Sequence, residues 1–123
     1  MYLICDEYGI IKTVGGEFLS VFGYKFTDLC DKFIGIVMSP YLSFLHSTYL
    51  LPMYRSMSTE QAEKTSHTFL SSMSIQSRPL ILYTKTREPV CVHLSVNHYK
   101  NESEGLFRMD ILSVEKMDAN LIY

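Results

Sequence analysis

The feature that most constrains this chain is the aromatic-rich stretch from Glu17 to Tyr54, in which glycine and proline separate short apolar groups. Gly23 stands between the aromatic residues Phe22 and Tyr24, so the pattern indicates that one short helix ends there. Ser39-Pro40 then begins a longer helix, because proline at the first helical position loses no hydrogen bond. We expect a series of short helical turns that leads into one longer helix.

The longer helix has mostly apolar residues, and one histidine, at helical spacing, which predicts one face packed against a sheet. These residues are Leu42, Leu45, His46, Tyr49 and Met53. Pro52 lacks the N–H that a helix interior requires, so we expect it to kink or end the helix near Leu51. Thr27 is the expected N-cap of an earlier helical turn, and residues 58–73 form either an extra helix or a loop.

Strand patterns flank this helical stretch on both sides. Tyr2–Cys5 and Ile10–Val14 predict a hairpin, with Gly9 in its turn. Three more extended runs follow, Leu80–Thr86, Val90–Tyr99 and Leu106–Glu115. The predicted fold is therefore α+β, with a five-stranded antiparallel sheet and short helices packed on one face. Residues 1–116 form this domain, and residues 117–123 are a tail or a linker to another domain.

Composition is that of a globular domain and excludes several classes of function. The chain has 123 residues, of which 47% are hydrophobic and 20% charged, so it can form one core. A net charge of −2 with scattered basic residues predicts no nucleic-acid partner. No apolar run reaches the ~20 residues of a bilayer span, so we expect no membrane partner. The odd set Cys5, Cys30 and Cys91 favours reduced thiols in the cytoplasm.

Several short motifs occur in an order that resembles the PAS family. They are Asp6-x-x-Gly9-Ile10, Phe22-Gly23-Tyr24, Met38-x-Pro40, His46-x-x-Tyr49 and Arg108-Met109-Asp110-Ile111. The helix motif is similar to the subgroup that reads M-P-x-P…H-D-x-Y, which includes oxygen sensors and eukaryotic signalling proteins. The sequence departs from the family pattern at Gly15, at Ser47 and at Arg87-Glu88.

The resemblance implies a sensory or regulatory module and not an enzyme. Such a module passes a change in ligand or partner occupancy to an attached effector, such as a kinase. The serine, histidine and aspartate residues show no nucleophile elbow that would indicate catalysis. The alternative is a non-sensing interaction scaffold of profilin-like shape, which acts through its outer surface alone.

Large apolar side chains are expected between the helices and the sheet. The residues expected to line this space are Phe22, Met38, His46, Tyr49, Met53, Phe107 and Met109. They either fill it at native packing density or leave room for a small hydrophobic ligand. The seven methionines favour an adaptable pocket or contact surface, because unbranched thioethers repack easily.

Two cofactors can be tested against the residues that would hold them. Haem needs an axial imidazole, and His67 is the candidate, whereas the resemblance gives His46 a structural role. One unsupported imidazole is weak grounds for haem, so a haem-based gas or redox sensor is the third interpretation. The flavin chemistry of light-oxygen-voltage domains needs a cysteine where this chain has Ile34. The sequence therefore identifies no cofactor.

The last predicted strand is apolar on both faces, which indicates that something covers the outer one. Phe107, Met109 and Ile111 share the inner face. We predict a homodimer, or a contact with an attached effector domain, through four residues of the outer face. These residues are Tyr99, Leu106, Leu112 and Val114.

Overall fold

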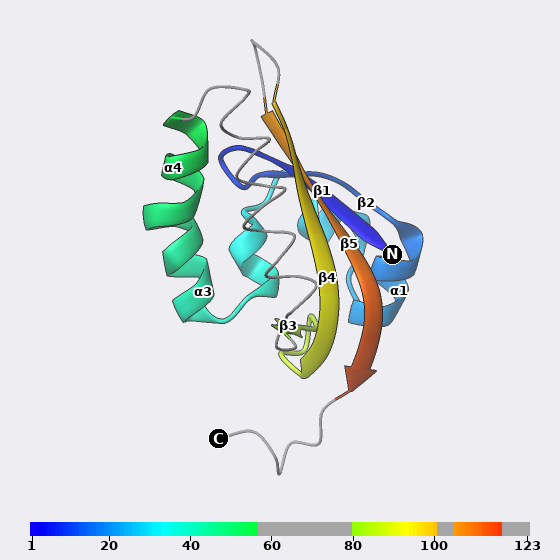
Figure 1. The fold of residues 1–123 in the computed structure, drawn as a ribbon. Helices are drawn as coiled ribbons and strands as arrows, with labels where there is room; N and C mark the ends of the chain where they lie inside the picture. The colour runs from blue at the N-terminus through cyan, green and yellow to red at the C-terminus, as the bar shows by residue number, and fades with distance from the viewer. Residues whose placement is uncertain (57–79, 101–104, 117–123) are drawn as a thin grey trace.

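The computed structural model describes residues 1–56, 80–100 and 105–116, and within them five strands form one antiparallel sheet in the order β2-β1-β5-β4-β3 (Figure 1). The strands are β1 (Tyr2–Asp6), β2 (Ile11–Val14), β3 (Leu80–Tyr83), β4 (Pro89–Lys100) and β5 (Gly105–Lys116). The helices are α1 (Gly16–Phe22), α2 (Phe26–Leu29), η1 (Ile34–Val37), α3 (Pro40–Leu45), η2 (His46–Leu50) and α4 (Leu51–Ser56). The predicted five-stranded antiparallel sheet with short helices is confirmed. The helix or loop predicted over residues 58–73 lies outside the described residues, as does the predicted tail.

The turn of the first hairpin forms as its residues predict. The Asp6 carboxylate accepts hydrogen bonds from the Tyr8 and Ile10 N–H groups, each at 2.9 Å. Gly9 has φ +79°, which is costly for any residue with a Cβ, and its backbone lies against the Phe33 ring. This turn pairs β1 with the edge strand β2, and β1 pairs with β5 on its other side.

One half of the interior is packed tightly around α1, and we call it the filled half. Its residues are Ile11, Phe18, Phe22, Leu29, Val37, Val90 and Val92, each less than 2% exposed. The Phe18 and Phe22 rings stack with centroids 4.4 Å apart. Gly23 ends α1 with φ +76°, as predicted.

The residue that precedes α2 differs from the prediction. Thr27 lies inside this helix and is not its N-cap. Lys25 precedes the helix instead, and its N–H donates to the Asp28 carboxylate at 2.8 Å. An acidic side chain in the first turn therefore satisfies a helix-start N–H in place of a hydroxyl at the cap.

Pro52 does not end the long helix, which continues to Ser56, so the predicted helix end near Leu51 was wrong. Ser39 caps α3 as expected, because its hydroxyl accepts from the Leu42 N–H at 3.2 Å. The chain then makes a five-residue π-helical turn, η2, in which the Leu51 N–H donates to the His46 carbonyl. Pro52 follows this widened turn directly, so its ring and missing N–H disturb the ladder less than in a regular helix. Figure 1 shows α3 and α4 as one continuous helical rod.

The π-turn also changes which residues face the sheet. A wider turn delays the rotation of the helix by about one residue. Tyr49 and Met53, predicted on the inner face, are therefore 61% and 38% exposed. Leu51 and Tyr54 are buried in their place. The predicted inner face of this helix was wrong beyond His46.

A β-bulge in β5 likewise changes which residues face the core. Beyond the bulge, the side chains of this strand alternate between the two faces in the opposite order. Leu94 pairs with Ile111 but the preceding His93 pairs with Ser113, so Leu112 is the extra residue. Val114 returns to the inner side, where it packs against the core, and its predicted place on the outer face is wrong. Tyr99 and Leu112 are on the outer face, 58% and 68% exposed, and Leu106 pairs with Tyr99 there half-buried.

Candidate ligand-binding cavity

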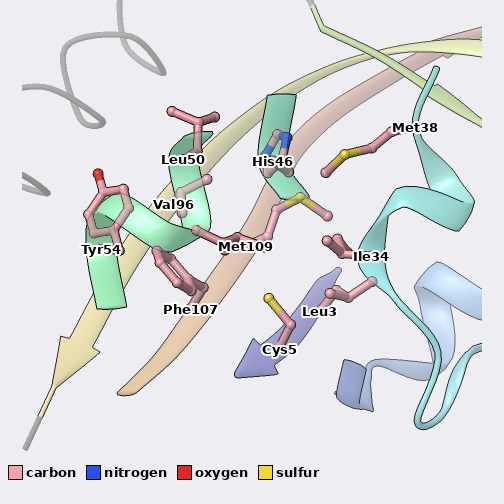
Figure 2. A pocket seen from close by; sticks show the side chains of 11 residues that line it. Leu3, Cys5, Ile34, Met38, His46, Leu50, Tyr54, Val96, Phe107 and Met109 are labelled. Atoms are coloured by element: carbon pink, nitrogen blue, oxygen red, sulfur yellow. The ribbon is translucent and has the colours of Figure 1, made fainter. Parts of the chain in front are cut away.

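The other half of the interior contains a partly open cavity of about 110 Å³, and we call it the hollow half. Its walls come from β1, η1, the π-turn η2, α4, β4 and β5 (Figure 2). The lining residues are Leu3, Cys5, Ile34, Met38, His46, Leu50, Leu51, Tyr54, Val96, Phe107 and Met109. Nearly all of these side chains are apolar, so the cavity suits an apolar occupant.

The predicted lining residues fall into three groups. Met38, His46, Phe107 and Met109 line the cavity. Phe22 is fully buried but belongs to the filled half, stacked on Phe18. Tyr49 and Met53 lie outside for the reason given above. The prediction that Phe22, Tyr49 and Met53 line the cavity was therefore wrong.

The wall residues that sequence reasoning missed come mainly from two sources. Leu3, Cys5 and Val96 lie on β1 and β4, where the alternation of inward residues could have identified them. Leu50, Leu51 and Tyr54 face inward only because of the π-turn. Apolar periodicity could not identify this second group, because it assumes a constant helical repeat.

His46 is held in one orientation by its own helix. Its Nδ1 lies 2.8 Å from the Leu42 carbonyl oxygen, one turn earlier. A carbonyl oxygen only accepts, so Nδ1 carries the proton that makes this bond. The neutral ring therefore has its lone pair on Nε2, and Figure 2 shows the ring beside the thioether ends of Met38 and Met109.

The thiol of Cys5 has low reactivity. Burial, and secondarily the negative charge of nearby Asp6, raises its pKa to about 12. The protonated thiol is a poor nucleophile and a poor metal ligand, since both roles require thiolate. Burial likewise raises the pKa of the Tyr54 phenol to about 12. The Cys5 and Tyr54 side chains are therefore both uncharged at neutral pH.

A buried hydrogen bond between His98 and Glu7 lies at the end of the hollow half beyond Tyr54. His98 Nε2 lies 3.1 Å from a carboxylate oxygen of Glu7. The His98 ring stacks on Phe107 at 4.3 Å, and Tyr54 meets it edge-on at 4.8 Å. Arg55 donates from Nη1 to the Glu7 carbonyl oxygen at 3.0 Å, which ties α4 to the first hairpin.

The turn between β3 and β4 holds the other side of the cavity. Arg87, at φ +64°, donates to the carbonyl oxygens of Ile36 and Met38 at 3.1 and 3.2 Å. These bonds fix the backbone of Met38, a wall residue, while its side chain keeps three rotatable bonds. At this wall of the cavity the backbone is fixed, whereas the Met38 side chain can adopt several rotamers.

The cavity that the described residues form is small for either cofactor. Its volume is well below the roughly 300–1,000 Å³ of sites for large ligands. His67, the haem-ligand candidate, lies outside the described residues. Ile34, where flavin photochemistry needs a cysteine, is a buried wall residue. Among the described residues no three His, Cys, Asp or Glu side chains gather as a metal site would require.

Comparison with known proteins identifies the fold. No family model matches the sequence, and no curated protein matches it. Among solved structures, the PAS domain of a protein from Desulfitobacterium hafniense matches with a TM-score of 0.61 and 15% sequence identity. The match covers 95% of this chain and 92% of that chain. The chain therefore has a PAS-like fold. In the part of the chain that the structure describes, no helix has the length and apolar character of a bilayer span.

Proposed function

We propose that this domain is a PAS-type regulatory module whose hollow half binds a small apolar ligand. The cavity between the π-turn, α4 and the sheet carries this proposal. The PAS-like fold supports it, since the resemblance implies a sensory role. A profilin-like scaffold that acts only through its outer surface would need no interior space, so the cavity favours the sensor.

A ligand would act on the elements that form the walls. It can shift the domain between two packings only by binding one of them more tightly. The wall includes Met109 on β5, and β5 runs to Lys116 at the end of the proposed domain, residues 1–116. We propose that an effector, such as a kinase, is attached beyond this strand and responds to its packing. The three cysteines are free, which supports a reducing, cytoplasmic setting.

The direct test is native mass spectrometry of freshly purified protein together with its absorption spectrum. We expect a bound species of low mass and no visible absorption band. A Soret band that His67→Ala abolishes would instead establish the haem sensor. A ligand-free mass, with no binding to any member of a library of small apolar compounds, would contradict the proposal and favour the scaffold.

A cavity-filling variant tests where the ligand sits. Val96→Phe adds volume at the wall of the cavity, so we expect it to remove ligand binding while the fold remains. Val21→Phe is the matched control, because Val21 is 38% exposed on α1 and away from the cavity. Equal binding by both variants would place the ligand elsewhere.

We also propose that the outer face of the sheet forms a homodimer. Tyr99 and Leu112 are large and exposed on neighbouring strands, and Leu106 lies beside Tyr99. Leu112→Glu should shift the sedimentation coefficient towards that of a monomer, because it places a charge in an apolar contact. Tyr41→Glu is the control, since Tyr41 is 70% exposed on α3. A wild-type protein that stays monomeric at high concentration would contradict the dimer.

A further inference from the structure

The cavity wall contains few groups that could make a polar contact with a ligand. They are the His46 ring, the Cys5 thiol and the Tyr54 hydroxyl. The thiol is a weak hydrogen-bonding group, and its raised pKa keeps it protonated. Figure 2 shows the Tyr54 ring at the edge of the group, with its oxygen turned away from His46 and Met109. His46 is therefore the polar group best placed to meet a ligand.

The hydrogen bond within the helix determines what His46 can offer. Nδ1 donates to the Leu42 carbonyl oxygen, so in the neutral ring Nε2 can only accept. Within the described residues Nε2 makes no hydrogen bond. The cavity thus has an apolar wall with one fixed acceptor, and a ligand that carries a donor gains a hydrogen bond that an apolar ligand cannot make.

We propose that the hollow half selects small, uncharged, mainly apolar molecules that carry one hydrogen-bond donor, which they give to Nε2 of His46. This inference rests on the proposed function and names its ligand class. A cavity of 110 Å³ suits about six to eight non-hydrogen atoms, since an apolar cavity of about 150 Å³ holds benzene. Ions are excluded because the apolar walls would not replace their hydration.

Phenol and toluene are suitable probes because they have the same number of non-hydrogen atoms and only phenol has a donor. Their dissociation constants are measured by calorimetry at pH 8, where an imidazole is normally neutral. His46→Asn keeps an amide donor near the Nδ1 position and removes Nε2. His46→Gln places an amide near the Nε2 position. His93→Asn is the control, since His93 is exposed on the outer face of β4.

The measured quantity is the preference for phenol, the toluene dissociation constant divided by the phenol dissociation constant. We expect His46→Asn to lower this preference about tenfold, the value of one net hydrogen bond, while toluene binding is unchanged. His46→Gln should recover part of the preference, and His93→Asn should match the wild type. An unchanged preference in His46→Asn, with toluene still bound, overturns this inference alone. Failure of both probes to bind the wild type overturns it together with the ligand cavity.

Discussion

The two halves of the interior share one sheet but differ in how completely their side chains fill the space. In the filled half, Phe18, Phe22 and Leu29 are 0% exposed, and the two rings stack. In the hollow half, Met38, Phe107 and Met109 border the cavity and are each 8% exposed. The comparison indicates that the filled half packs in one arrangement, whereas the π-turn and α4 border space that a side chain or a ligand could occupy.

The difference follows from the side chains that each half uses. Stacked aromatic rings and branched aliphatic residues have few rotamers, so they pack in one arrangement. Methionine has three rotatable bonds in its side chain and fills irregular space in several ways. A domain built from both kinds of packing can stay folded while one end of its interior changes occupant.

The largest expected effect is in the filled half. Phe22→Ala removes a fully buried ring and its stacking contact with Phe18, so it should lower the free energy of unfolding by about 3–5 kcal/mol. Val21→Ala, one residue earlier and exposed, should change it by less than about 0.5 kcal/mol. Urea denaturation measures both. If Phe22→Ala lowers the free energy of unfolding by less than about 1 kcal/mol, the filled half is packed no more tightly than the hollow half.

The next effect concerns the buried hydrogen bond between His98 and Glu7 at the end of the hollow half. A Cβ at Gly105 would overlap the Glu7 carboxylate, so Gly105→Ala should displace Glu7 from His98. A buried polar group that loses its hydrogen-bond partner costs about 1–3 kcal/mol. Thermal or urea unfolding measures this loss.

Gly16→Ala is the matched control for that substitution. Nothing lies within 4 Å of a Cβ at Gly16, the first residue of α1, so this variant should gain about 0.4–1 kcal/mol. If both glycine variants are neutral, the Glu7–His98 pair does not need the space that Gly105 leaves, and the end of the hollow half is as adaptable as its wall.

A smaller effect is expected where the interior is already partly empty. Met109→Ala should cost about 2 kcal/mol, the lower end of the range for such truncations, because Met109 borders the cavity and part of its surface has no neighbour to lose. The enlarged cavity should accept indole more tightly than the wild type does, which calorimetry measures. A cost as large as that of Phe22→Ala would mean that Met109 packs as firmly as the filled half.

The two halves also differ in how far the sequence predicted them. In the first hairpin and α1, local chemistry was sufficient, because Gly9 and Gly23 have the positive φ values that their turns require. The five-stranded sheet followed from five extended runs and from their order, two before the helical stretch and three after it. Met38, His46, Phe107 and Met109, which the apolar pattern and the resemblance predicted to lie between helices and sheet, line the cavity.

The wrong predictions of inward and outward side chains arose at two places, where one extra residue shifts the helical or the strand repeat. The π-turn rotated Tyr49 and Met53 outward, and the bulge at Leu112 turned Val114 inward. The π-turn and the bulge leave the number of apolar residues unchanged and alter only which of them face the core. A fixed repeat of 3.6 residues for a helix or 2 for a strand therefore cannot detect them. Pro52 was the available signal, because a proline inside an otherwise helical pattern is better accommodated after a widened turn.

The smallest expected effect depends on pH and concerns the filled half. The Lys25 N–H, and secondarily the Lys85 ammonium at 3.0 Å, hold the pKa of Asp28 below its usual value of 3.8. A depressed folded pKa stabilises the protein above the unfolded pKa, and this stabilisation is lost as the pH falls through the folded value. Asp28→Asn should therefore lower the thermal midpoint slightly at pH 7. The difference from the wild type should shrink below about pH 4, as the Asp28 carboxyl becomes protonated.

Differential scanning calorimetry between pH 2.5 and 7 tests this expectation, with Glu115→Gln as the control because Glu115 is exposed at the end of β5. Solvent screens the exposed pair of Asp28 and Lys85, so the effect should also weaken in about 1 M salt. A difference that persists at pH 2.5 would show that the Asp28→Asn substitution disturbs α2 by the shape of the new side chain and not by the lost charge. In that case the start of α2 would depend on packing in the filled half more than on the carboxylate that accepts from Lys25.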